Sequence, residues 1–239
     1  MKQKLYLFLL FTLIGLLGNS LHVLAQDIPE PTAQWEFNDA DDLMVPSKGS
    51  LKMVPAVIGT RSITLSTISE AGITPTDGPD EGNKAIFIPK TSALKVERAE
   101  GAVASTSYTI MMDVKVLDAS PYDGLFQTNE RNGDDGDLFF NKNQIGVASL
   151  GGYFGKVKNN AWNRIVLAYR DGKNIVYLNG EKLVAANPDN NDRFKIQPFG
   201  FYLFCDEDNE KVDNYVSEVA FWETALTDDQ IRALGGYKE

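Results

Sequence analysis

Apolar and polar residues alternate in short stretches along most of the chain, which is the pattern of half-buried β-strands. Between residues 108 and 116, Tyr108, Ile110, Met112, Val114 and Val116 lie on one face of such a strand. Turn-forming residues separate these stretches, and no long repeat recurs, so neither a solenoid nor a propeller is predicted. We therefore predict an all-β domain whose two antiparallel sheets form a sandwich. Further strands are expected at residues 35–37, 51–57, 63–68, 85–89, 93–96, 125–128, 137–141, 144–148, 199–204 and 215–221.

The stretch from 162 to 184 predicts a meander of three strands. Residues 163–170 and 173–178 are rich in β-branched and aromatic residues and flank Asp171-Gly172. A type I′ turn needs positive φ at both central positions, and Asp-Gly and Asn-Gly supply it most readily. Asn179-Gly180 then turns the chain into a third strand at 181–184.

Only one helix is predicted, and it lies near the C-terminus. Thr227 is followed three residues later by Gln230, which completes a capping box. Leu226 and Ile231 occupy the positions of a hydrophobic staple, and Gly235 supplies a left-handed residue after the helix. These features are structural, and we expect this helix to pack against the sandwich.

Three segments resemble the laminin-G-like jelly-roll family of the concanavalin-A-like lectin/glucanase group. They are residues 162–169, 175–181 and 216–234. Upstream, 34–38 resembles the opening strand of the family and 107–116 one of its framework strands, so the resemblance covers nearly all of the mature chain. It implies a jelly-roll sandwich with one short C-terminal helix. The matching residues belong to the framework of the fold and do not identify a ligand.

The N-terminus has the features of an export signal. Lys2 and Lys4 precede an apolar stretch at 5–17 that is too short to span a bilayer, and Val23-Leu24-Ala25 forms a small-residue cleavage site. We expect residues 1–25 to be removed and residues 26–239 to form one domain. The apolar stretch ends without the cysteine of a lipoprotein anchor, and no second apolar run of spanning length follows. The mature protein is therefore expected in the periplasm or outside the cell.

Composition excludes several classes of function. With 33 acidic and 23 basic residues the formal net charge is −10, so the surface repels phosphate backbones and nucleic acid is not expected as a partner. Cys205 is the only cysteine, which excludes an internal disulfide. His22 is the only histidine and is lost with the signal, which removes imidazole-based nucleophilic and zinc chemistry.

Two acidic loops could hold Ca²⁺, because hard cations prefer several oxygen ligands and Gly- and Asp-rich turns can supply them. They are residues 132–137 and 206–210, and neither follows the EF-hand pattern. The second resembles an acidic turn of some exported relatives, and the laminin-G resemblance also implies a calcium site at one rim. The alternative is a pair of solvated turns. The candidate ligands are Asp206, Asp208, Glu210, Asp213, Asp134 and Asp137.

An enzyme is not expected. The glucanase branch of the resembling group uses a Glu-x-Asp-x-x-Glu strand, which this sequence lacks. Polysaccharide lyases on similar sandwiches usually rely on histidine with tyrosine, and the mature chain has no histidine. A glycoside hydrolase or lyase remains the weaker alternative. A buried, converging pair of acids in the middle of a concave sheet would favour it.

Aromatic side chains in loops suggest sugar recognition, which needs a flat apolar surface beside polar partners for hydroxyl groups. The candidates are Tyr122, Tyr153 and Phe154; the alternative is that they belong to the core. The tryptophans at 35, 162 and 222 are expected in the core. We therefore expect an exported, non-catalytic module that binds carbohydrate with the help of Ca²⁺. The alternative is a structural or adhesion module that binds a cell-surface protein.

Overall fold

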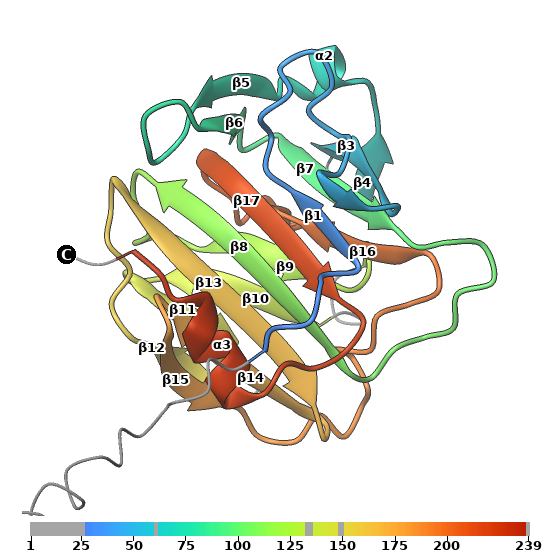
Figure 1. Cartoon of the computed structure of the whole chain (residues 1–239), viewed down its shortest axis with the longest axis vertical. Helices are drawn as coiled ribbons and strands as arrows, with labels where there is room; N and C mark the ends of the chain where they lie inside the picture. The colour runs from blue at the N-terminus through green and yellow to red at the C-terminus, as the bar shows by residue number, and fades with distance from the viewer. Residues whose placement is uncertain (1–26, 60–61, 132–135, 148–150, 238–239) are drawn as a thin grey trace, which may run out of the picture.

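Two antiparallel β-sheets stack face to face, so the chain forms the sandwich that the alternating pattern predicts (Figure 1). The computed structural model describes residues 27–59, 62–131, 136–147 and 151–237. The expected signal at 1–25 lies outside these residues. In the view of Figure 1 a nine-stranded sheet faces the reader and an eight-stranded sheet lies behind it.

The nine-stranded sheet has β8 and β17 near its centre. Its order is β15-β14-β13-β8-β17-β1-β2, with β6 pairing β17 and β5 pairing β6. The strands are β1 (Ala33–Trp35), β2 (Lys48–Gly49), β5 (Thr74–Asp77), β6 (Lys84–Ile88), β8 (Tyr108–Val116), β13 (Ala161–Arg170), β14 (Lys173–Leu178), β15 (Glu181–Ala185) and β17 (Asn214–Trp222).

The eight-stranded sheet runs in the order β12-β11-β10-β9-β16-β7-β3-β4. Its strands are β3 (Lys52–Gly59), β4 (Ser62–Leu65), β7 (Ser92–Glu97), β9 (Asp123–Gln127), β10 (Asp137–Asn141), β11 (Gln144–Val147), β12 (Gly152–Phe154) and β16 (Gly200–Leu203). Every strand pair that the structure describes in either sheet is antiparallel.

The two predicted hairpin turns are confirmed. Asp171 and Gly172 have φ of 52° and 68°, and Asn179 and Gly180 have φ of 51° and 82°. Positive φ at both central residues matches the right-handed twist of the flanking strands, which is why these dipeptides occur here. The meander β13-β14-β15 therefore follows directly from the local sequence.

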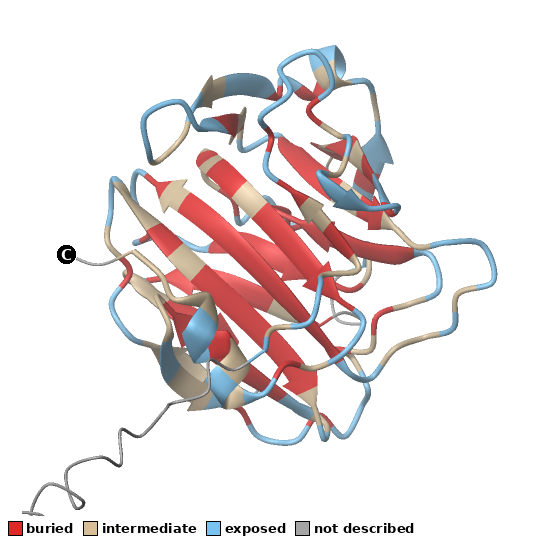
Figure 2. Cartoon of the chain, viewed as in Figure 1, coloured by how far each residue is buried: buried red, intermediate tan, exposed pale blue. Residues whose placement is uncertain are grey.

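The core fills the space between the sheets, and the central strands are buried (Figure 2). The alternating face of β8 contributes to it with every predicted residue from Tyr108 to Val116. Tyr108 is fully buried, and its hydroxyl donates to the Phe194 carbonyl at 2.7 Å, so its polar atom is satisfied. The opposite faces of the sheets point outward and carry the surfaces described below.

The predicted C-terminal helix is α3 (Asp228–Leu234), and its capping box at Thr227 and Gln230 is formed. Ile231 is fully buried and packs with Leu226 on the outer face of the nine-stranded sheet. Gly235 has positive φ, but its ψ of −149° differs from the left-handed cap that was expected.

The structure also has a second short helix, α2 (Ile68–Ala71), which follows β4 and was missed in the sequence analysis. Its signal was in the sequence: Thr67 and Glu70 form a capping box of the same kind as in α3, and Gly72 ends the turn with φ of 70°. Only four residues long, α2 gives no helical periodicity, so Ile68 was assigned to the preceding strand. Across the described ranges, no helix has the length and apolarity that crossing a bilayer requires.

Candidate functional site

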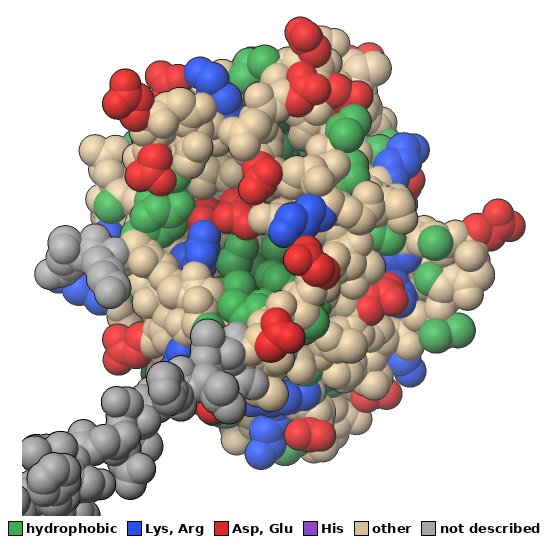
Figure 3. All heavy atoms as spheres, viewed as in Figure 1, with side chains coloured by type: hydrophobic (Ala, Val, Ile, Leu, Met, Phe, Trp, Pro, Cys, Tyr) green, Lys and Arg blue, Asp and Glu red, His purple; other side chains and the backbone are tan. Residues whose placement is uncertain are grey.

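A hollow lies over the middle of the outer face of the nine-stranded sheet. Figure 3 shows this face with hydrophobic side chains at its floor and acidic and basic side chains around them. Its polar part is a cavity of about 170 Å³, lined by residues of β6, β8, β13 and β17, by the segment that follows β1, by the loop at 79–83 and by Tyr237. We call this cavity and the apolar cavity that adjoins it the outer groove.

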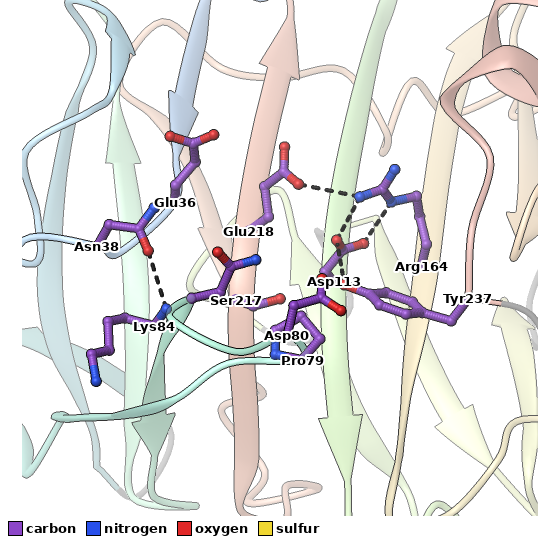
Figure 4. Close-up of a pocket in the computed structure, with 11 residues that line it drawn as sticks. Glu36, Asn38, Pro79, Asp80, Lys84, Asp113, Arg164, Ser217, Glu218 and Tyr237 are labelled. Carbon is purple, nitrogen blue, oxygen red and sulfur yellow. Dashed lines mark hydrogen bonds and ion pairs between the residues drawn. The ribbon is translucent and has the colours of Figure 1, made fainter.

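Four charged side chains form a row across the floor of the outer groove. Arg164 on β13 pairs in register with Asp113 on β8, and Asp113 pairs with Glu218 on β17. Trp35, the last residue of β1, is opposite Val219, and Glu36 follows it beside Glu218. Three acids and one arginine therefore lie side by side on one face of the sheet, on β13, β8 and β17 and just after β1 (Figure 4).

A β-bulge in β17 sets this row. The register between β17 and β8 shifts between Val216 and Glu218, which leaves Ser217 as the extra residue. Val216 and Val219 remain in the core, so the bulge allows Ser217 and Glu218 both to leave it. Both residues line the polar cavity.

Arg164 holds the row together. Its Nε and Nη2 donate to the two carboxylate oxygens of Asp113 at 2.7 and 2.6 Å, which is the bidentate geometry of a strong ion pair. Nη2 also lies 3.2 Å from Oε2 of Glu218, and Nη1 donates to the carbonyl of Leu234 at the end of α3 at 2.6 Å. The Tyr237 hydroxyl donates to Asp113 at 2.9 Å. The ion pair therefore also fixes α3 and the C-terminal segment.

Burial and neighbouring charges both shift the pKa values of Glu218 and Arg164. Burial raises the pKa of Glu218, and the carboxylates of Asp113 and Glu36 raise it further, whereas Arg164 and Gln34 oppose the rise. Burial lowers the pKa of Arg164, but its bonds to Asp113 and the charge of Glu218 raise it overall. Four acids and two bases line the polar cavity, so its electrostatic character is acidic.

The adjoining cavity, of about 250 Å³, shares Arg164 and Glu218 with the polar one. Met111, Ala220 and Trp222 of the sheet and Leu234 of α3 form its apolar lining. The indole Nε1 of Trp222 donates to the carbonyl of Pro29 at 2.7 Å, which ties the N-terminal segment along one side. The outer groove is thus acidic at one end and of mixed polar and apolar character at the other.

Asp113 and Glu218 are two acids that converge on one sheet, which is the arrangement named above as typical of a hydrolase. Here Arg164 binds both, and it takes both oxygens of Asp113. An acid held in this way is not free to accept a proton from substrate or to attack it. The pair functions in this structure as an ion-pair cluster.

The sequence analysis did not find the outer groove. Its charged residues are single outward-facing positions of separate strands, spaced 51 to 77 positions apart between Glu36 and Glu218. A single charged residue in an alternating strand is the ordinary solvent-facing pattern. The one available signal was Ser217-Glu218, where two polar residues in succession interrupt the alternation of β17.

The structure brings two of the three predicted aromatic residues together on the other outer face. Tyr122, which precedes β9, is 42% exposed, and its ring centroid lies 6.1 Å from that of Tyr153 on β12 at an interplanar angle of 70°. Phe139 on β10 lies edge-on to Tyr122 at 6.0 Å. In the register of the sheet Phe139 is opposite Gly146, which is opposite Tyr153. We call Tyr122, Phe139 and Tyr153 the aromatic patch.

Carboxylates lie beside the aromatic patch. Burial raises the pKa of Tyr153, and Tyr122, Asp137 and Glu210 add to the rise, which places both acids near its hydroxyl. Burial raises the pKa of Asp137 to about 6, with Arg193 opposing the rise. The carboxylates of Asp137 and Glu210, which can accept hydrogen bonds from hydroxyl groups, therefore lie near the partly exposed rings of Tyr122 and Tyr153.

Phe154 does not join the aromatic patch. It is half-buried and pairs with Ile145, whose side chain is in the core, so it lies on the opposite face of β12 from Tyr153. Strand alternation separates neighbouring residues in this way. The sequence placed both in a Gly-flanked turn, which the structure replaces with an edge strand.

The predicted calcium ligands are only partly assembled. Oδ2 of Asp206 accepts hydrogen bonds from the backbone N–H groups of Asp208 and Glu210 at 2.8 and 3.0 Å. This carboxylate therefore stabilises the turn of the acidic loop. Asp213 accepts the N–H of Lys90 at 2.8 Å, away from that turn. Asp134 falls outside the described residues. Within the ranges that the structure covers, no three acidic, cysteine or histidine side chains form a metal-binding group.

The tryptophans differ from the expectation that all three are core residues. Trp35 is fully buried between the sheets, as predicted. Trp222 is buried, but it lies on the outer face beneath α3 and the N-terminal segment. Trp162 is half-buried on the outer face, with Lys115 5.5 Å from its ring centroid. Val166 of β13 and Trp222 of β17 are outward positions that are apolar because α3 covers this part of the sheet.

The two stacked antiparallel sheets define the chain as a β-sandwich. Residues 96–223, more than half of the chain, match the family described as a domain of unknown function, DUF1583_N, and the chain belongs to that family. No curated protein has detectable sequence similarity to it.

Three solved structures show the same fold. Domain 4 of AbnA, an extracellular arabinanase from Geobacillus stearothermophilus solved with arabinotriose, has 17% identity and a TM-score of 0.60, covering 87% of this chain and 100% of the domain. The botulinum neurotoxin D/C binding domain has 11% identity and a TM-score of 0.56, with coverage of 85% and 51%. A botulinum neurotoxin type C structure, described by its interaction with two gangliosides, has 10% identity and a TM-score of 0.50, with coverage of 84% and 50%. The chain spans about half the length of these toxin structures.

Proposed function

We propose that this protein is an exported, non-catalytic module that binds carbohydrate through the aromatic patch. The observation that carries the proposal is the contact between Tyr122 and Tyr153, which are distant in sequence and meet at the surface beside Asp137 and Glu210. Rings stack on the apolar faces of sugars, and carboxylates accept hydrogen bonds from their hydroxyl groups. We assign the module to the laminin-G-like branch of the sandwich fold.

The similar structures support the class of function without specifying the ligand. One was solved with arabinotriose and another is described by its interaction with gangliosides, and both ligands are glycans. At 17% identity or less, these likenesses concern the fold. Support for a non-catalytic role comes from Arg164, which occupies the converging acids of the nine-stranded sheet.

A glycan array probed with the mature chain tests the proposal. We expect binding to at least one glycan, and we expect Tyr122→Ala and Tyr153→Ala each to weaken it about tenfold or more, because each removes part of the stacking surface. Phe199→Ala is the matched control, since Phe199 is equally exposed at 43% but contacts Tyr202 instead. An array without hits, or hits that both tyrosine variants retain, would refute the proposal.

The role of Ca²⁺ is a separate proposal, in which the loop at 206–210 becomes ordered around the ion. Its support is the acidic composition of the loop and the exposure of Asp208 and Glu210. Thermal melts in millimolar calcium and in chelator test it. We expect a higher melting temperature with calcium. Coincident melting curves in calcium and in chelator would show that the loop does not bind the ion.

A further inference from the structure

The outer groove has a feature that the proposed function does not use, because it lies on the opposite sheet from the aromatic patch. Glu36 directly follows β1, beside Glu218 of β17, and the two carboxylates point to the same side of the sheet (Figure 4). Like charges at opposed positions of antiparallel strands destabilise the sheet. Glu218 has Gln34 and Arg164 as partners, whereas Glu36 makes no hydrogen bond or ion pair within the described chain.

The bases of the polar cavity do not compensate for this charge. Nε and Nη2 of Arg164 both donate to Asp113, and only Nη2 also contacts Glu218. Lys84 extends its ammonium group away from Glu36 and pairs with Asp77 at 3.2 Å (Figure 4). The cavity therefore keeps an excess of negative charge.

A second, independent observation indicates a missing donor. Ser217 is only 7% exposed and lines the same cavity; within the described part of the chain its hydroxyl makes no hydrogen bond of normal geometry, and the one polar group that interacts with it is the Tyr237 hydroxyl. The neighbouring Tyr237 hydroxyl donates to Asp113 instead. A buried polar atom without a partner carries a desolvation cost, so its retention calls for a ligand that satisfies it.

We propose that the outer groove binds a primary ammonium group carried on an aliphatic stem. An ammonium group has three N–H donors, and Glu36, Glu218 and the Ser217 hydroxyl offer three acceptors at the polar cavity. The adjoining cavity, with Met111 and Ala220 at its floor, accommodates the stem. The ligand class is that of short alkylamines and diamines.

A metal ion fits this position less well. Ca²⁺ takes six to eight oxygen ligands and Mg²⁺ requires octahedral geometry. No group of three metal-binding side chains occurs in the described ranges. An ammonium ion needs fewer acceptors, and its stem gains from apolar contact that a metal cannot use.

Calorimetric titration of the mature chain with cadaverine at low ionic strength tests the proposal, with pentane-1,5-diol as the neutral analogue of the same length. We expect saturable binding of cadaverine and none of the diol. Glu36→Gln should weaken cadaverine binding about tenfold or more, because a charge-assisted hydrogen bond is lost. Ser217→Ala should weaken it less, since it removes a neutral acceptor.

The matched control is Glu81→Gln, which removes the same charge from the neighbouring loop without lining the cavity. A thermal melt of each variant without ligand separates binding from folding: Glu36→Gln should not lower the melting temperature, because it relieves repulsion. The proposal fails if cadaverine does not bind, if the diol binds equally well, or if Glu81→Gln has the effect of Glu36→Gln. None of these outcomes bears on the glycan array, which probes the other sheet.

Discussion

Arg164 on β13 is opposite Asp113 on β8 and donates two short hydrogen bonds to its carboxylate, although both residues lie on the outer face of the sheet. The Asp113 side chain is 2% exposed and that of Arg164 19%, so water screens the pair little. Because Arg164 also binds Glu218 and the end of α3, the pair joins the sheet, the helix and the outer groove.

Arg164→Met should therefore destabilise the protein strongly. It leaves the Asp113 carboxylate buried with only the Tyr237 hydroxyl as a partner, and breaking a buried ion pair from one side typically costs about 3–5 kcal/mol. Urea denaturation at pH 7 measures the change. Arg232→Met is the control, because its pair with Asp229 is exposed and should contribute little. Equal effects of the two substitutions would contradict the importance given to burial.

Ser217→Ala should stabilise the unliganded protein. The hydroxyl is buried without a hydrogen bond of normal geometry, and only the Tyr237 hydroxyl interacts with it, so replacing it with hydrogen removes a desolvation cost of about 1 kcal/mol while the bulge remains. Chemical denaturation with and without cadaverine measures both effects, and the gain should disappear when the amine is present. A loss of stability of similar size would mean that Ser217 has a partner in solution.

The strands and turns were predictable from the sequence because their causes are local. Alternation at 108–116 and the Asp171-Gly172 and Asn179-Gly180 dipeptides each determine a structure within a few residues. The row of Glu36, Glu218, Asp113 and Arg164 was not predictable, since it depends on which strands become neighbours and on a bulge that no residue type requires. Strand order is a property of the whole chain.

The aromatic residues illustrate the same limit within one site. The sequence analysis named Tyr122, Tyr153 and Phe154 as candidates without pairing Tyr122 with Tyr153; in the structure these two rings meet, whereas Phe154, next to Tyr153, lies on the other face of β12. A glycine-flanked segment can be read as a turn or as an edge strand, and only the pairing with β11 decides which. Trp162 was misassigned for the same reason, because the face of β13 that α3 leaves open is not marked in the sequence.

Asp137 should make stability fall as the pH rises from about 4 to about 6. Burial raises its pKa to about 6, Asp206, Glu207 and Glu210 contribute, and Arg193 opposes the rise. The folded state thus binds a proton that the unfolded state, with a pKa near 3.8, has already released, so folding loses about 2–3 kcal/mol across this window. Above pH 6 the contribution is constant.

Urea denaturation of Asp137→Asn between pH 4 and 7 checks this. The variant cannot titrate at this position, so it should be more stable than the wild type at pH 7, and the difference should shrink toward pH 4. Asp39→Asn, at an exposed acid, should follow the wild type at every pH. A difference that is independent of pH would show that Asp137 is ionised throughout.

Asp228 should show the opposite dependence on pH. It lies at the first turn of α3, where Lys182 contacts one carboxylate oxygen at 2.7 Å and Arg170 contacts the other. Burial opposes ionisation, but hydrogen bonds from Lys182, Tyr177 and Arg170 outweigh it and lower the pKa well below its usual value. The charge also lies near the positive end of the helix dipole. Asp228 therefore stabilises the folded state above pH 4, and this contribution is lost as the pH falls.

Asp228→Asn should thus destabilise the protein by about 1 kcal/mol at pH 7, an estimate reduced because the side chain is 28% exposed. The difference from the wild type should narrow as the pH falls below 4, because protonation removes the same charge. Asp229→Asn is the matched control on the next residue: its side chain is 72% exposed and pairs only within the helix, so little change is expected. If Asp228→Asn and Asp229→Asn have equal effects at pH 7, the helix dipole explains both, and the bonds from Arg170 and Lys182 do not anchor α3.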